Sequence, residues 1–191
     1  MSPFRCEPLS EANAPKLAAL FDRAGHGCYC QWWLFEGDKN AWLARVAHEP
    51  EANRRALLAA PRGPSVVAFD AGGAAVGFLR LESSLDLPKL YRERVYRDLP
   101  CFSGKRTDVY TVGCFFVEEA SRRQGVARTL LRHAIREVKA LGGATIEAFP
   151  RRGEGLPVEQ AFTGPFDLFV SEGFSVVHDF APYPVLRLTL S

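Results

Sequence analysis

The sequence contains no apolar run as long as a membrane-spanning helix, and its N-terminal stretch lacks the apolar core of a secretory signal peptide. The formal net charge is only +2, whereas a domain that coats nucleic acid is strongly basic. Internal repeats and low-complexity segments are also missing from the sequence. We therefore expect a cytoplasmic protein that associates with neither a membrane nor a nucleic acid.

Cysteine is present but follows no pattern. The five cysteines are an odd number and lack the short, regular spacing of a disulfide framework. We therefore expect free thiols in a reducing compartment. A structural zinc site usually needs a second pair of ligands, and no such pair accompanies Cys28 and Cys30. The sequence thus predicts no metal.

The composition is that of a soluble globular protein, with 47% apolar and 24% charged residues. A chain of 191 residues is long enough for one domain with a substantial core and short for two. We expect a single domain over residues 1–191.

Hydrophobic periodicity and turn residues divide the chain into strands and helices. The predicted strands are 4–9, a hairpin over 65–82, 109–117, 144–149, 174–178 and 185–190; the predicted helices are one capped by Ser10, 40–48, 51–60, 126–141 and 164–172. Residues 83–100 are predicted as a surface helix or as a lid over a substrate site. Hairpin strands pair antiparallel, and a strand–helix–strand unit favours a parallel pair. The pattern predicts a mixed α/β fold.

One turn in this pattern is suited to binding phosphate. A buried strand over residues 109–117 leads through polar residues into Arg122-Arg123-Gln124-Gly125-Val126-Ala127, where an amphipathic helix begins. The first turn of a helix presents free backbone N–H groups and the positive end of the helix dipole. Gly125 lets a ligand approach the backbone closely.

This turn resembles the acyl-CoA-binding signature of the GNAT family of N-acetyltransferases, Arg/Gln-x-x-Gly-x-Gly/Ala. The resemblance implies a sheet that is antiparallel and then parallel, flanked by helices, with acetyl-CoA as co-substrate, and it is compatible with a homodimer. The residues it implies for cofactor binding are Phe115, Phe116, Val117, Arg122, Arg123, Gln124, Gly125, Val126, Ala127, Arg128 and Phe169. In such enzymes an amine attacks acetyl-CoA directly, and free backbone amides near residues 115–117 stabilise the charge on the thioester oxygen.

The chain departs from that family at the expected proton donor. A tyrosine commonly precedes the glycine of the closing Gly-Phe pair by four residues, and here that position is Phe169, which has no proton to donate. Glu82, at the end of a predicted strand, is a candidate general base. Tyr110 and Cys114 share one face of their strand by alternation, and each is a candidate for the catalytic machinery.

Residues 26–33 combine a histidine, two cysteines, a tyrosine and two tryptophans. Three interpretations remain open: packing in the core, metal binding by His26, Cys28 and Cys30, or a wall of the acceptor pocket. Under the third, the substrate-binding residues are Cys28, Tyr29, Trp32 and Trp33. A similar cysteine- and tryptophan-rich segment occurs in a little-described bacterial branch of the GNAT family.

Two functions are compatible with these features. The first is an N-acetyltransferase that moves the acetyl group of acetyl-CoA to an amine of a small molecule or peptide, within a ternary complex. The alternative is a catalytically silent acyl-CoA-binding or sensor domain, which the phenylalanine at position 169 favours.

Overall fold

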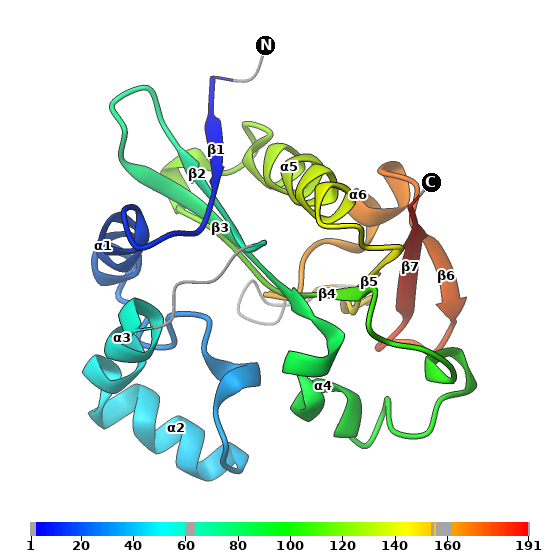
Figure 1. Ribbon diagram of the computed structural model, residues 1–191. Helices are drawn as coiled ribbons and strands as arrows, with labels where there is room; N and C mark the ends of the chain where they lie inside the picture. The colour runs from blue at the N-terminus through cyan, green and yellow to red at the C-terminus, as the bar shows by residue number, and fades with distance from the viewer. Residues whose placement is uncertain (1–2, 60–63, 154, 156–161, 191) are drawn as a thin grey trace.

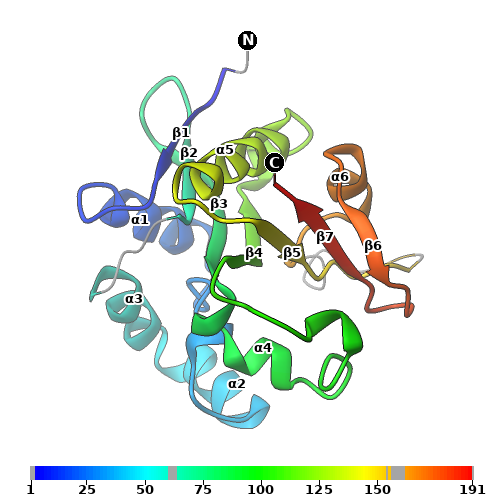
Figure 2. The ribbon, with the colours of Figure 1, turned by 45° about the vertical axis from the view of Figure 1, so that its right-hand side comes forward.

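A seven-stranded sheet forms the centre of the molecule (Figure 1). The computed structural model describes residues 3–59, 64–153, 155 and 162–190. The strands are β1 (Arg5–Pro8), β2 (Val66–Phe69), β3 (Ala75–Ser83), β4 (Val109–Val117), β5 (Thr145–Ala148), β6 (Ser175–His178) and β7 (Val185–Thr189), in the order β1-β2-β3-β4-β5-β7-β6. Strands β1 and β6 therefore form the two edges, which lie on opposite sides of the molecule (Figure 2).

Among the described strands, β4 and β5 form the one parallel pair of the sheet. Strands β1 to β4 pair antiparallel, β4 and β5 pair parallel, and β7 pairs antiparallel with both β5 and β6. The parallel pair needs a long crossover, and the helix α5 (Val126–Ala140) supplies it. This arrangement confirms the predicted mixed α/β fold with an antiparallel-then-parallel sheet.

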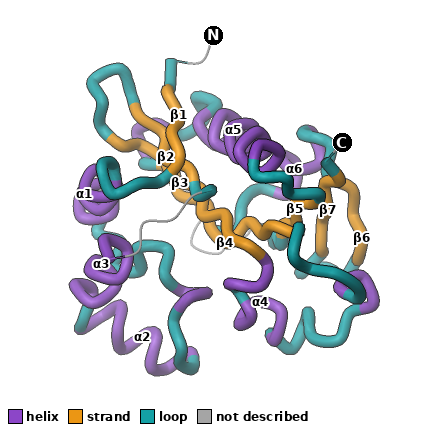
Figure 3. Tube along the Cα trace, in the orientation of Figure 1, coloured by secondary structure: helices purple, strands orange, loops and turns teal. Residues whose placement is uncertain are grey.

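Helices cover both faces of the sheet (Figure 3). The remaining helices are α1 (Ala14–Ala24), α2 (Lys39–His48), α3 (Pro50–Ala59), α4 (Pro88–Arg92) and α6 (Phe166–Ser171). One core lies between the sheet and α5, where Leu130, Leu131 and Ala134 are fully buried. A second core lies on the opposite face, between the sheet and α1. Residue 60, the last of one predicted helix, falls outside the described residues.

The first helix begins later than predicted. Asn13, and not Ser10, is the N-cap of α1, and no acidic residue lies in the first turn. The Ser10 backbone N–H donates to Oδ1 of Asn13 at 2.9 Å, and Nδ2 of the Asn13 side chain donates to the Pro8 carbonyl. Residues 10–13 therefore form a turn that Asn13 holds, and Pro15 fixes the first helical turn.

A bulge divides β4. Arg80 of β3 lies opposite Cys114, but the next residue, Leu81, lies opposite Val112, so Gly113 is an extra residue on β4. The insertion reverses which side chains face each side of the sheet. Tyr110 consequently packs in the core beneath α5, whereas Cys114 belongs to the core beneath α1. The prediction that these two side chains share a face is wrong, because simple alternation does not hold across a bulge.

Residues 83–108 make an irregular cover over one end of the sheet. They contain α4, preceded by a 3₁₀ turn over Ser84–Asp86, and a small core that includes Leu87, Leu90 and Tyr96. Among the described residues, no helix is both long and apolar enough to span a bilayer.

Candidate functional site

A cavity of about 1430 Å³ runs along the second half of β4. That volume exceeds the roughly 300–1,000 Å³ of a typical small-molecule pocket, and thus leaves room for two ligands. Its described lining comes from α1 and the loop after it, from α2, from β4, from the turn before α5 and the start of α5, and from the segment around α6. The residues are Phe21, His26, Cys28, Cys30, Trp32, Trp33, Trp42, Gly113, Cys114, Phe115, Phe116, Val117, Glu119, Ser121, Arg122, Arg123, Gly125, Val126, Ala127, Arg128, Phe162, Pro165, Asp167, Leu168 and Ser171.

The cavity exists because β4 separates from β5. The two strands pair only over residues 109–111 of β4 and 145–147 of β5. Beyond that point the Glu118 amide donates a hydrogen bond to the Val76 carbonyl of β3. Because successive backbone N–H groups of a strand point to opposite sides, the amides of Val117 and Phe115 face away from β3. The family resemblance implied a free amide at Phe115, but this amide donates a hydrogen bond to the Phe162 carbonyl. The Val117 amide points toward the open side.

The turn before α5 has the geometry predicted for an anion site. Gly125 is the N-cap of α5 with φ of +86°, and no side chain caps the helix N-terminus. A Cβ built on Gly125 would meet no atom within 4 Å, so the backbone there is open to a ligand. Arg122 Nε donates to the Val117 carbonyl at 3.1 Å, and Gln124 Nε2 donates to the Ala120 carbonyl at 2.8 Å. These two side chains shape the turn.

All but two of the residues predicted to bind the cofactor line the cavity. Gln124 holds the turn from outside the lining. Phe169 is fully buried and packs its ring against Phe115, at 5.8 Å between centroids, and against Phe174, at 5.1 Å. Its ring tip also lies against Gly164, where an added Cβ would come within 2.9 Å of Cζ. Phe169 thus supports the wall formed by Phe115 from behind.

The opposite end of the cavity is aromatic. Trp32, Trp33 and Trp42 all line it, with ring centroids of 5.8 Å for Trp32–Trp33 and 5.5 Å for Trp32–Trp42. Trp33 Nε1 donates to the Gly113 carbonyl at 2.9 Å, which attaches this wall to the bulge of β4. Lys89 Nζ lies 3.4 Å from the centroid of the Trp32 ring, and burial lowers the pKa of this lysine.

Tyr29 does not take part in this wall. Its side chain is buried in the core beneath α1, and its hydroxyl donates to Asp22. Burial, followed by the bond to Asp22, raises the pKa of Tyr29 to about 12. Of the four predicted substrate residues, the cavity thus brings together Cys28, Trp32 and Trp33.

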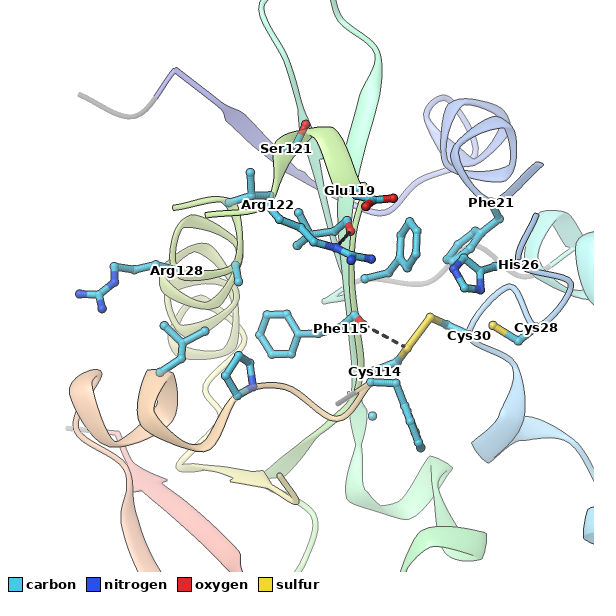
Figure 4. A pocket seen from close by; sticks show the side chains of 18 of the residues that line it. Phe21, His26, Cys28, Cys30, Cys114, Phe115, Glu119, Ser121, Arg122 and Arg128 are labelled. Carbon is cyan, nitrogen blue, oxygen red and sulfur yellow. Dashed lines mark hydrogen bonds between the residues drawn. A yellow bond between two sulfur atoms is a disulfide. The ribbon is translucent and has the colours of Figure 1, made fainter. Parts of the chain in front are cut away.

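A disulfide joins Cys30 to Cys114, with 6.2 Å between their Cα atoms (Figure 4). The expectation of free thiols throughout is therefore wrong, and Cys6, Cys28 and Cys101 are the free cysteines. Residues 28–30 form a turn, with positive φ of 45° at Tyr29 and 54° at Cys30. Among the described residues, no group of three or more histidine, cysteine or acidic side chains could hold a metal.

The three catalytic candidates are dispersed. Glu82 is 2% exposed, receives a 2.6 Å hydrogen bond from Arg80 and does not line the cavity. Tyr110 lies on the α5 side of the sheet. Cys114 has no thiol proton while it is bonded to Cys30, so it cannot serve as a catalytic thiol in this state.

Sequence reasoning named His26 only as a possible metal ligand, and the structure makes it a candidate for proton transfer. Of the described residues that line the cavity, His26 alone carries an imidazole, and its ring meets the Phe116 ring at 5.0 Å between centroids. The sequence shows His26 only as a neighbour of two cysteines. Its position opposite β4 depends on the turn after α1, which no local pattern indicates.

A mixed sheet whose parallel pair diverges beside an uncapped helix N-terminus and a cavity defines an α/β protein with a candidate ligand-binding site. Residues 29–152 match the sequence model of the acetyltransferase (GNAT) family. The chain belongs to the GNAT family of acetyltransferases, as the sequence resemblance implied.

Solved structures show the same fold. A GCN5-related N-acetyltransferase from Kribbella flavida superposes with a TM-score of 0.57 at 20% identity, covering 98% of each chain. PaiA N-acetyltransferase from Thermoplasma acidophilum, in complex with coenzyme A, gives 0.56 at 13% identity over 100% of both chains. YncA from Salmonella typhimurium with acetyl-CoA gives 0.51 at 15% identity, covering 100% of this chain and 95% of that one. Among curated proteins none matches the sequence.

Proposed function

We propose that this protein, as one domain over residues 1–191, is an acetyl-CoA-dependent N-acetyltransferase. The observation that carries the proposal is the continuity of the cavity from the helix N-terminus at Gly125 to the tryptophan wall. One end suits the phosphates of a donor, and the other suits the body of an acceptor. The cytoplasmic location and the homodimer stay predictions.

The donor is proposed to bind along the open edge of β4. Its pyrophosphate would accept hydrogen bonds from the first amides of α5, beyond Gly125. The pantetheine arm would run beside the amide of Val117, which points toward the open side. The Phe115 amide becomes a donor to the thioester oxygen only if the Phe162 carbonyl yields its bond.

The acceptor is proposed to be an amine with an apolar or aromatic body, either a small molecule or a peptide side chain. The wall nearest the disulfide offers three indole rings and the ring of Phe162. Flat apolar surfaces of this kind bind apolar groups and confer little selectivity for polar ones.

His26 is the proposed proton acceptor for the amine, in preference to Glu82. The imidazole lines the cavity, whereas the Glu82 carboxylate is buried and paired with Arg80. One ring nitrogen of a neutral imidazole can accept a proton while the other already carries one. The proton it takes from the amine is then available to the departing thiolate, which removes the need for a tyrosine at position 169.

The test has two stages. Calorimetric titration with acetyl-CoA measures donor binding in the wild type and in Gly125→Glu. A panel of arylalkylamines, polyamines and apolar peptides is then assayed for CoA release by chromatography. We expect micromolar binding and turnover on aromatic amines, and loss of both in the variant. Absence of acetyl-CoA binding at millimolar concentration would sink the proposal.

A catalytically silent acyl-CoA-binding or sensor domain is the second candidate. It is favoured by the burial of Phe169 among Phe115 and Phe174, which leaves no proton donor at that position. Tight acetyl-CoA binding with no turnover across the whole amine panel would select this candidate. Turnover on any amine, lost in the Gly125→Glu variant, would discard it.

A further inference from the structure

Three of the five cysteines lie in the walls of a single cavity. Cys30 and Cys114 form the disulfide, and the free thiol of Cys28 lines the same space, next to it in Figure 4. Cys6 in β1 packs beneath α5, and Cys101 lies in the cover after α4. Neither lines the cavity. The disulfide therefore borders the cavity as well as the core beneath α1.

The position of the disulfide relative to the donor site matters. Cys114 directly precedes Phe115, at the point where the open edge of β4 begins. The ring of Phe115 and the disulfide extend to opposite sides of β4 (Figure 4). A donor whose phosphates bind at Gly125 and whose arm follows β4 toward Phe115 brings its sulfur to this stretch. This step rests on the proposed function, because it requires CoA in the cavity.

We propose that free CoA exchanges with the Cys30–Cys114 disulfide and becomes covalently attached to Cys114. The CoA thiolate attacks the sulfur of Cys114, a CoA–Cys114 bond forms as the Cys30–Cys114 bond breaks, and Cys30 leaves as a thiolate that takes up a proton. The two electrons of the original disulfide bond are conserved in the exchange, so no outside oxidant is needed.

The exchange distinguishes CoA from acetyl-CoA. The sulfur of acetyl-CoA is acylated and cannot attack, so acetyl-CoA does not react with the disulfide. CoA that accumulates as product blocks the donor site, because the mixed disulfide holds CoA in place. Cys30, released beside it, can attack the mixed disulfide and restore the starting state. Burial raises the pKa of Cys28, so this third thiol stays protonated and competes poorly as a nucleophile.

Opening the disulfide also loosens the acceptor wall. The bond spans 84 residues of sequence and ties the turn at residues 28–30 to β4. After exchange, the hydrogen bond from Trp33 to Gly113 remains as an attachment between this wall and the strand. A covalent CoA thus both fills the donor site and frees one side of the acceptor site.

The test uses the full chain purified without reductant. Thiol titration should find three free thiols before reduction and five after it. The protein is then incubated with CoA, acetyl-CoA or glutathione and followed by intact mass spectrometry and peptide mapping. Calorimetry of acetyl-CoA binding runs in parallel on the same preparation. Gly125→Glu blocks the donor turn, and Cys6→Ser is the matched control for loss of a cysteine outside the cavity.

We expect CoA to add the mass of one whole CoA at Cys114, and dithiothreitol to remove it. Labelling should be at least about tenfold faster than with glutathione, because the binding site raises the effective concentration of the thiol. Acetyl-CoA should give no adduct, Gly125→Glu should lose the preference for CoA, and Cys6→Ser should behave as the wild type.

Several results would overturn the inference. They are five free thiols before reduction, equal labelling by glutathione, attachment to any other cysteine, or no adduct in a preparation that binds acetyl-CoA in the calorimeter. The last of these leaves the proposed acetyltransferase intact. Failure of acetyl-CoA to bind at all would reject the proposed function together with the exchange.

Discussion

The two halves of β4 share one strand and differ in almost every other respect. Tyr110 and Thr111 are paired on both sides, with β3 and with β5. Residues 114–117 keep β3 as a partner and face a cavity where β5 has turned away. The bulge at Gly113 marks the change. The first half uses its backbone groups for structure, and the second half leaves some of them to a ligand.

The first half of β4, which we call the closed half, has a buried charge network beside it. The Glu147 carboxylate on β5 is fully buried and receives hydrogen bonds from Arg106, Arg187 and Tyr91, and Tyr91 also bonds to Thr111 of β4. Burial alone would raise the pKa of Glu147, but the hydrogen bonds from Arg106, Tyr91 and Arg187 outweigh it and hold the pKa below its usual range. A carboxylate with this many partners has no lone pair left for a substrate.

The largest effect is expected where the closed half loses this carboxylate. Glu147→Ala leaves the Arg106 and Arg187 guanidinium groups without their shared counter-charge in a partly buried site. We expect a loss of about 3 to 5 kcal/mol in the free energy of unfolding, measured by urea denaturation. Glu147→Gln keeps the shape and should lose less. A loss below about 1 kcal/mol in Glu147→Ala would show that the network does not stabilise the closed half.

Acid should weaken the same half by a smaller amount, because a protonated carboxyl still accepts hydrogen bonds. The folded-state pKa of Glu147 is below its unfolded value, so its contribution is complete above the unfolded pKa and is lost as pH falls through the folded pKa. Unfolding free energy of the wild type should therefore decline below about pH 4.3, the ordinary glutamate value. The decline should be shallower in Glu147→Gln, and equal slopes would contradict the assignment.

The open half of β4, residues 114–117 with the turn before α5, should respond mainly in ligand binding. Gly125→Glu places a carboxylate at the helix N-terminus where phosphate is expected, and we predict about 100-fold weaker acetyl-CoA binding, or about 2.7 kcal/mol. Gly125→Ala is the matched control, because both variants have the same cost of a left-handed φ and only one adds charge. Calorimetry should find Gly125→Ala within about threefold of the wild type. Equal weakening in both variants would attribute the effect to the backbone.

Sequence periodicity was sufficient for most of the elements and for the turn before α5. The predicted strand 109–117 coincides with β4, and the turn at Arg122 to Arg128 lies where the pattern indicated. Local patterns failed wherever the outcome depends on distant partners. Gly113 reads as one more small residue in an apolar run, so the bulge that separates Tyr110 from Cys114 gave no signal.

The same limit applies to the charged and sulfur-containing side chains. The bond between Cys30 and Cys114 joins positions 84 residues apart, and no spacing rule connects them. In the sequence, Glu147 looks like any polar residue of a short strand. Its partners Arg106 and Arg187 lie about 40 residues away on either side, so no local pattern indicates the network. Composition did indicate that Cys28, Trp32 and Trp33 could line a pocket, and they do line the cavity, but no local pattern placed His26 there.

The smallest effect is expected at the junction of the two halves. Trp33→Phe keeps an aromatic ring in the acceptor wall but removes the hydrogen bond to the Gly113 carbonyl at the bulge. We expect a loss of about 1 kcal/mol in stability and a rise of a few fold in KM for the acceptor amine, with acetyl-CoA affinity unchanged. Trp32→Phe removes an indole from the same wall without touching that bond to β4. If both variants raise KM equally, the hydrogen bond from Trp33 to Gly113 contributes nothing to acceptor binding beyond aromatic surface.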